Sequence, residues 1–100
     1  ILIIHVITYK YIYTVIYKFS AEWCGPCKAY KEIFNRVTSN YSDIDVNEID
    51  IDKNISLAQE FGIRSIPTTV IRKNGVELKK IVGIVSEHDL TKHINKYINI

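Results

Sequence analysis

The chain has 100 residues, a length that suits one domain built around one core. Hydrophobic residues make up 47% of it and charged residues 24%, a balance that excludes an intrinsically disordered chain. The formal net charge is only +2, and the lysines do not gather on one segment, so nothing favours nucleic-acid binding. We therefore expect a single domain over residues 1–100 that binds no nucleic acid.

The N-terminal stretch is apolar, but we expect neither a membrane span nor a signal peptide in it. His5, Lys10 and Lys18 interrupt it, so no run is long enough to cross a bilayer. It also has no charged leading region and no small-residue cleavage site. Residues 1–12 include a strand-like segment, but the next strand follows after fewer residues than the roughly one dozen that a parallel crossover needs. The topology of residues 1–12 stays open.

Three elements are predicted in the first half of the chain. Residues 13–19 (YTVIYKF) are β-branched and aromatic, which predicts a buried strand. From Cys24 to about Tyr41, apolar side chains recur every three or four residues and predict a helix, with Pro26 in its first turn. Residues 43–51 (DIDVNEIDI) alternate and predict a second strand.

The second half predicts a short helix, a hairpin and a final helix. The short helix takes residues 55–61 and ends at Gly62, a residue type typical of the position after a helix. The turn Lys73-Asn74-Gly75 between alternating segments indicates two antiparallel strands. Ser86 caps the final helix, which has acidic residues in its first turn and one apolar stripe.

Both cysteines of the chain lie in one motif, Cys24-Gly25-Pro26-Cys27. A framework of structural disulfides is excluded because there is no other thiol, and the histidines show no zinc-ligand spacing. Two cysteines that are merely buried in the core are one interpretation. We favour the other, a dithiol that cycles between the oxidised and the reduced state.

The position of the motif suggests different roles for the two sulfurs. Cys24 lies at the N-terminal end of the predicted helix, where free N–H groups and the helix dipole favour a thiolate. Cys27 lies one turn further on, close enough to form a disulfide, and we expect it to be less exposed and to stay protonated. Cys24 would attack a substrate disulfide, and Cys27 would then resolve the mixed disulfide and release the reduced substrate.

Several segments occur in the order and spacing of one known family. From about residue 14 to the C-terminus, the motifs AEWCGPCK, IDIDKN, LAQEFGIRSIPT, KNG and VG resemble those of thioredoxins. The resemblance implies an α/β thioredoxin fold, with a central mixed β-sheet flanked by helices. It also implies that the first helix of the family is shortened or missing in this chain.

The resemblance assigns roles to matching positions. It implies that Cys24 is the nucleophile and Cys27 the resolving cysteine. Pro67 matches the cis-proline of the family, and Ile66 before it would offer its backbone N–H and C=O to an extended substrate segment. The substrate-docking surface that it implies comprises Trp23, Gly25, Pro26, Ile66, Pro67 and Gly83, with Val82 and Ile84 beside Gly83.

Lys18 is unexpected in an apolar strand that leads to a thiol site. The family has a buried aspartate at this position and a lysine on the neighbouring strand, where this chain has Glu48, so the two charges have exchanged places. An unpaired buried ammonium costs several kcal/mol. We therefore expect a catalytic Lys18–Glu48 ion pair; the alternative is that Lys18 extends to solvent and Glu48 is simply exposed.

The expected pair offers two routes for the proton of Cys27. A protonated Lys18 would stabilise the Cys27 thiolate, and Glu48 would accept its proton directly or through a water molecule. In the other route, a Lys18 that has lost its own proton is the base.

Five other polar residues are expected to have ordinary roles. His88 and His93 lie on the final helix and are expected to be solvated rather than to bind metal. Asp50 and Asp52 stand between a strand and a helix, where turn and cap roles are typical. Arg64 precedes the cis-proline loop and is a candidate for attracting acidic partners.

The preferred function is a cytoplasmic protein-disulfide reductase that a thioredoxin reductase reduces again. It would act as a monomer that binds no membrane and needs no cofactor besides the Cys24–Cys27 disulfide. A disulfide oxidase or isomerase is the alternative, and it would need a higher reduction potential. A non-catalytic subunit of a larger assembly, or a thiol-bridged metal cluster shared by two chains, are the remaining possibilities.

Overall fold

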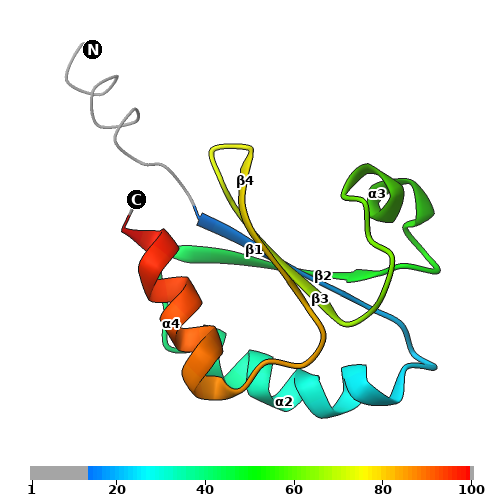
Figure 1. Ribbon diagram of the computed structural model, residues 1–100, viewed down its shortest axis with the longest axis horizontal. Helices are drawn as coiled ribbons and strands as arrows, with labels where there is room; N and C mark the ends of the chain where they lie inside the picture. The colour runs from blue at the N-terminus through cyan, green and yellow to red at the C-terminus, as the bar shows by residue number, and fades with distance from the viewer. Residues whose placement is uncertain (1–13, 100) are drawn as a thin grey trace.

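The computed structural model of the protein describes residues 14–99 (Figure 1). The strand-like segment within residues 1–12, and with it the expected loss of the first helix, lies outside these residues. The elements are, in chain order, β1 (Thr14–Ser20), α2 (Gly25–Thr38), β2 (Ile44–Asp50), α3 (Ile55–Glu60), β3 (Thr68–Lys73), β4 (Val76–Val82) and α4 (Glu87–Ile98).

The four strands form one mixed sheet in the order β2-β1-β3-β4. β1 and β2 run parallel, with α2 as the crossover between them, while β1 pairs antiparallel with β3, and β3 pairs antiparallel with β4. The predicted mixed sheet with flanking helices is therefore confirmed. The C-terminal ends of β1 and β2 lie at the same edge of the sheet, next to the beginning of α2 (Figure 1).

Each face of the sheet has its own hydrophobic cluster, because side chains alternate between the faces of a strand. On the face covered by α2 and α4, Ile16 and Ile71 pack against fully buried side chains of both helices. On the opposite face, Phe19 and Val70 pack against Phe61, beside α3. Alternation along β1 therefore places every second residue after Ile16 beneath α2.

The predicted helix at Cys24 is confirmed, but it ends at Thr38 rather than near Tyr41. The Thr38 hydroxyl donates to the carbonyl of Phe34 at 2.8 Å, and the backbone N–H of Ser39 donates to that of Asn35, so the last carbonyls are already satisfied. Tyr41 continues the apolar spacing because its ring packs on the core from the following loop. The periodicity reflects contact with the core and not helical structure at this point.

The turn and cap predictions are confirmed. Asn74 and Gly75 both have positive φ, 55° and 79°, as a two-residue hairpin turn between twisted strands requires. Gly62 follows α3 with φ 67°. Ser86 caps α4, with its hydroxyl accepting a hydrogen bond from the N–H of Asp89 at 3.1 Å.

Candidate active site

The two cysteines form a disulfide at the beginning of α2, with their Cα atoms 5.2 Å apart. Cys24 is the N-cap residue of α2, and its sulfur accepts a hydrogen bond from the N–H of Cys27 at 3.1 Å. This N–H is one of the donors that a helix leaves unpaired at its N-terminus. A negative charge on the Cys24 sulfur would therefore be stabilised both by this N–H and by the helix dipole.

The expected difference in exposure between the two cysteines is not observed. Cys24 and Cys27 are each 4% exposed, so Cys27 is not the less exposed of the two. Bonded sulfurs shield one another, and both cysteines pack with Ala21 in one small cluster, against which Ile66 also lies. In this oxidised state the two cysteines differ in their hydrogen bonding rather than in their exposure.

The loop before β3 lies against the disulfide. The Ile66–Pro67 peptide bond is cis, as the resemblance implies, and the carbonyl oxygen of Ile66 is 4.0 Å from the sulfur of Cys24. The N–H of Gly83 donates to the Pro67 carbonyl at 2.8 Å, which ties the end of β4 to this loop. Within residues 14–99, neither the N–H nor the C=O of Ile66 is used by another backbone group. Both remain available to pair with an extended segment.

Large apolar side chains around the disulfide are exposed to solvent. Trp23 is 67% exposed, Val82 62% and Ile84 50%, and Pro26 is exposed as well. Isolated exposed apolar side chains are common, but a group of them beside a reactive disulfide indicates a contact surface. The residues expected to form the docking surface are thus grouped around the cysteines.

Asp52 makes a contact that was not predicted from the sequence. Its carboxylate accepts a hydrogen bond from the indole N–H of Trp23 at 2.7 Å, and its own backbone N–H donates to the Asp50 carboxylate at 2.9 Å. The second contact is the predicted turn role, whereas the first orients the tryptophan. A signal was present, because Trp23 and Asp52 each follow one of two strands that end at the same edge of a parallel pair.

A small apolar hollow lies next to Trp23. Its volume is about 330 Å³, and it is lined by Trp23, Ile51, Ala58, Ile63, Arg64, Ser65 and Ile66. Its walls are mostly apolar, and Ile66 of the cis-proline loop is one of them. Arg64 is exposed at this hollow.

The predicted Lys18–Glu48 ion pair is confirmed. Lys18 Nζ lies 2.7 Å from Glu48 Oε1, and the two residues are paired in register on the parallel strands β1 and β2. Lys18 is only 3% exposed, so it does not extend to solvent. Its ammonium also lies 5.0 Å from the centre of the Phe34 ring, which contributes a cation–π contact.

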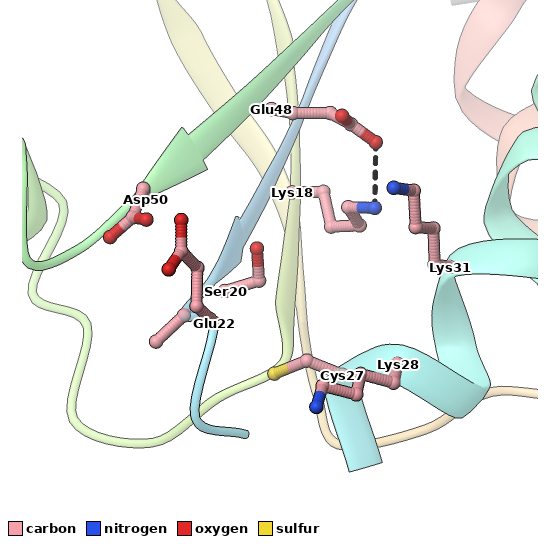
Figure 2. A pocket seen from close by; sticks show the side chains of 9 residues that line it. Lys18, Ser20, Glu22, Cys27, Lys28, Lys31, Glu48 and Asp50 are labelled. Atoms are coloured by element: carbon pink, nitrogen blue, oxygen red, sulfur yellow. Dashed lines mark ion pairs between the residues drawn. The ribbon is translucent and has the colours of Figure 1, made fainter. Parts of the chain in front are cut away.

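The ion pair and Cys27 share one pocket (Figure 2). The pocket has a volume of about 510 Å³ and is lined by Lys18, Ser20, Ala21, Glu22, Cys27, Lys28, Lys31, Glu48 and Asp50. Side chains of both charges therefore line the pocket on the Cys27 side of the disulfide.

The remaining candidates have no part in this site. His88 and His93 lie on α4, and burial and the charge of nearby Lys79 lower the pKa of His93. In the part of the chain from residue 14 to residue 99, no group of three or more His, Cys, Asp and Glu side chains is placed to hold a metal ion. The helices in this same part are too short or too polar to cross a bilayer.

Comparisons with known proteins agree on one family. Residues 8–96 match the family model described as Thioredoxin. Thioredoxin of Porphyra purpurea is 40% identical over 86 residues, which cover 85% of this chain and 80% of the relative. Thioredoxin 1 of Synechococcus elongatus is 36% identical over 85 residues, which cover 84% of this chain and 79% of the relative.

Comparison with solved structures indicates the same family. Thioredoxin NaTrxh from Nicotiana alata superimposes with a TM-score of 0.80 at 36% identity, covering 85% of this chain and 73% of that one. Thioredoxin-2 of the malaria parasite, described as a component of its protein secretion machinery, gives a TM-score of 0.81 at 31% identity, covering 86% and 84%. The thioredoxin fold is therefore confirmed, and thioredoxins need no cofactor beyond their cysteine pair. The chain belongs to the thioredoxin family, and its Cys24–Cys27 pair makes it a thiol–disulfide oxidoreductase.

Proposed function

We propose that the chain acts as a protein-disulfide reductase, with Cys24 as nucleophile and Cys27 as resolving cysteine. The hydrogen bond from the Cys27 N–H to the Cys24 sulfur at the N-terminus of α2 carries this proposal. It supports Cys24 as the sulfur that the helix terminus would stabilise as a thiolate, and a thiolate is the species that attacks a disulfide.

The reaction balances in two exchanges. The reduced Cys24 thiolate attacks one sulfur of the substrate disulfide, and the other substrate sulfur leaves with the electron pair and takes up a proton. Cys27, after losing its proton, attacks the Cys24 sulfur of the mixed disulfide, and the second substrate sulfur leaves in the same way. The cysteine pair has then lost two electrons to the substrate and become the disulfide that the structure contains.

Substrate binding is assigned to the surface around the disulfide. An extended segment would pair with the free N–H and C=O of Ile66, next to Pro67, and so place its disulfide beside the Cys24 sulfur, 4.0 Å from that carbonyl. The exposed Trp23, Gly25 and Pro26 would contact the segment on one side and Gly83 with its apolar neighbours on the other.

Protein substrates and a reductase are the partners that family membership implies. We propose that a thioredoxin reductase returns two electrons to the pair, so that the chain takes part in electron transport. We further propose a monomer that acts as a single domain over residues 1–100, in the cytoplasm and bound to neither membrane nor nucleic acid. The exposed docking surface supports the monomer, since a stable dimer through it would block substrates.

A trapping experiment tests the direction and the two roles. With a chemical or enzymatic source of electrons, the unchanged protein is expected to reduce the disulfides of insulin. Cys24→Ser is expected to abolish the reaction, because the attacking sulfur is gone. Cys27→Ser is expected to accumulate a mixed disulfide with insulin through Cys24, visible as a higher mass that a thiol reagent releases.

The two serine variants also act as each other's control. Serine is a good N-cap residue, so Cys24→Ser should keep α2 intact. Trapping by the Cys24→Ser variant instead of the Cys27→Ser variant would reverse the assigned roles. A protein that oxidises reduced substrates but does not reduce insulin would contradict the reductase direction and favour an oxidase.

A further inference from the structure

A buried cation lies in the wall of the pocket that Cys27 also lines. The side chain of Lys18 is only 4% exposed, whereas that of its partner Glu48 is 48% exposed. The ammonium contacts the Glu48 carboxylate at 2.7 Å and lies 5.0 Å from the centre of the Phe34 ring. The ion pair thus has a buried positive end and a negative end that is open to water.

We propose that this pair controls the charge of Cys27: Lys18 is a positioning residue that stabilises the Cys27 thiolate, and Glu48 accepts the proton of the Cys27 thiol through water in the pocket that they share. The inference rests on the proposed function, in which Cys27 must lose its proton before it resolves the mixed disulfide. Three observations support it: the short Lys18–Glu48 contact, the burial of Lys18, and the pocket that both share with Cys27 (Figure 2).

The proton transfer creates no net charge at the site. Before it, the ammonium is neutralised by the Glu48 carboxylate, and Cys27 is a neutral thiol. After it, Glu48 is a neutral acid, and the Cys27 thiolate has become the counter-ion of Lys18. A step that keeps the total charge constant avoids the cost of placing an uncompensated charge where little water screens it.

The remaining atoms and electrons follow from the second exchange. The Cys27 thiolate attacks the Cys24 sulfur, a new bond forms between the two cysteines, and the bond from Cys24 to the substrate sulfur breaks. The electron pair leaves with the substrate sulfur, which takes a proton from water. Glu48 releases its proton to water through its exposed end, and the ion pair is restored.

Other charged groups face the same pocket, and each of them is more exposed to water than Lys18. Lys28 and Lys31 come from α2, Glu22 follows β1, and Asp50 ends β2; the first three are exposed and Asp50 is partly buried. Figure 2 shows the ammonium of Lys31 directed toward the ion pair, with Glu22 and Asp50 on the far side of Ser20. Water and salt screen exposed charges, so their effect on Cys27 is expected to be smaller. Lys31→Gln is therefore a matched control for the loss of one positive charge.

The test measures the ionisation of Cys27 alone. The chain has two cysteines, so in a Cys24→Ser background the ultraviolet absorbance of the thiolate reports only on Cys27. Lys18→Met is expected to raise the pH at which half of Cys27 is ionised by about one unit or more, because a nearby opposite charge is lost. Glu48→Gln is expected to lower it, because the ammonium is no longer neutralised by a carboxylate.

The inference predicts that the half-ionisation pH of Cys27 shifts in opposite directions in the two variants. An ion pair with a purely structural role gives no reason for such opposite shifts. In the same background, Lys31→Gln is expected to change the half-ionisation pH by less than about 0.5 unit. Unchanged values in both pair variants, or shifts of both in the same direction, would overturn the inference. If Glu48→Gln does not fold, Lys18→Met decides alone, and the absence of an upward shift overturns the inference.

The failure of this inference is distinguishable from the failure of the proposed function. Insulin reduction by the unchanged protein is measured in parallel. Reduction together with unshifted Cys27 ionisation would remove only the role of the ion pair. Opposite shifts without insulin reduction would leave the electrostatics of Cys27 standing and remove the reductase.

Discussion

At the scale of single residues, Lys18 shows how a charge is kept inside an apolar strand. Alternation along β1 puts Lys18 on the same face as the fully buried Ile16, beneath α2. The register between the parallel strands places Glu48 beside it, and the carboxylate compensates the buried ammonium. The two partners differ in burial, so replacing each of them is expected to lower the free energy of unfolding by a different amount.

The loss of Glu48 and the loss of Lys18 should destabilise the protein to different extents. Glu48→Gln leaves a buried ammonium without an anion, and we expect it to lower the free energy of unfolding by about 3 kcal/mol. Lys18→Met leaves only a half-exposed carboxylate and an apolar stem, so a loss of at most about 1 kcal/mol is expected. Urea unfolding of the oxidised proteins measures both. A larger loss for Lys18→Met than for Glu48→Gln would show that the burial of the ammonium is not the dominant cost.

At the scale of elements, the site depends on how α2 is joined to β3, because α2 carries the cysteines and β3 follows the cis-proline loop. The hydroxyl of Tyr30 on α2 and that of Thr69 on β3 are hydrogen-bonded at 2.7 Å, and both residues are fully buried. Burial raises the pKa of Tyr30, and the bond to Thr69 opposes this only in part. The folded state therefore keeps Tyr30 neutral at a pH at which the unfolded chain ionises it.

This arrangement predicts that the ionisation of Tyr30 lowers the stability of the protein at alkaline pH. Its contribution is complete below a pH of about 10, the ordinary value for tyrosine, and is lost as the pH rises through the raised pKa of the folded state. Tyr30→Phe should remove this part of the loss. At neutral pH it should cost about 1–3 kcal/mol, since the Thr69 hydroxyl is left buried without its partner.

Tyr41→Phe is the matched control for the cost at neutral pH. The Tyr41 hydroxyl donates to Asn95 in an exposed hydrogen bond of 2.6 Å, so its removal at neutral pH should cost less than about 1 kcal/mol. Urea unfolding at neutral pH compares the two variants, and the same measurement at alkaline pH compares Tyr30→Phe with the unchanged protein. Equal costs at neutral pH would contradict a structural role for the buried bond between α2 and β3.

The bounds of helices and strands were predictable where single residues or neighbouring residues specify them. Asn74-Gly75, Ser86 and Gly62 specify a turn, a cap and a helix end through their own backbone preferences, and all three were predicted correctly. The end of α2 was not, because apolar spacing at Tyr41 cannot distinguish a helix from a loop that returns to the core. The hydrogen bond between Trp23 and Asp52 was missed for a related reason: it depends on which strand ends are neighbours.

At the scale of the whole molecule, the sheet order gathers the site from four separate segments. The end of β1, the beginning of α2, the loop before β3 and the end of β4 meet at the disulfide, and the bond from Gly83 to Pro67 closes this arrangement. The cysteine motif and the Lys18–Glu48 pair were predictable from the sequence because family motifs align those positions. The equal burial of the two sulfurs was not, because it is a property of the packed, oxidised state.

The reduction potential of the Cys24–Cys27 pair tests the proposed direction of electron flow most directly. Equilibration with a glutathione or dithiothreitol redox buffer, followed by the fraction of free thiol, gives this value. A reductase predicts a potential near about −270 mV, low enough for the pair to donate electrons to most protein disulfides. A potential near about −120 to −180 mV, in the range of oxidases and isomerases, would contradict the reductase assignment.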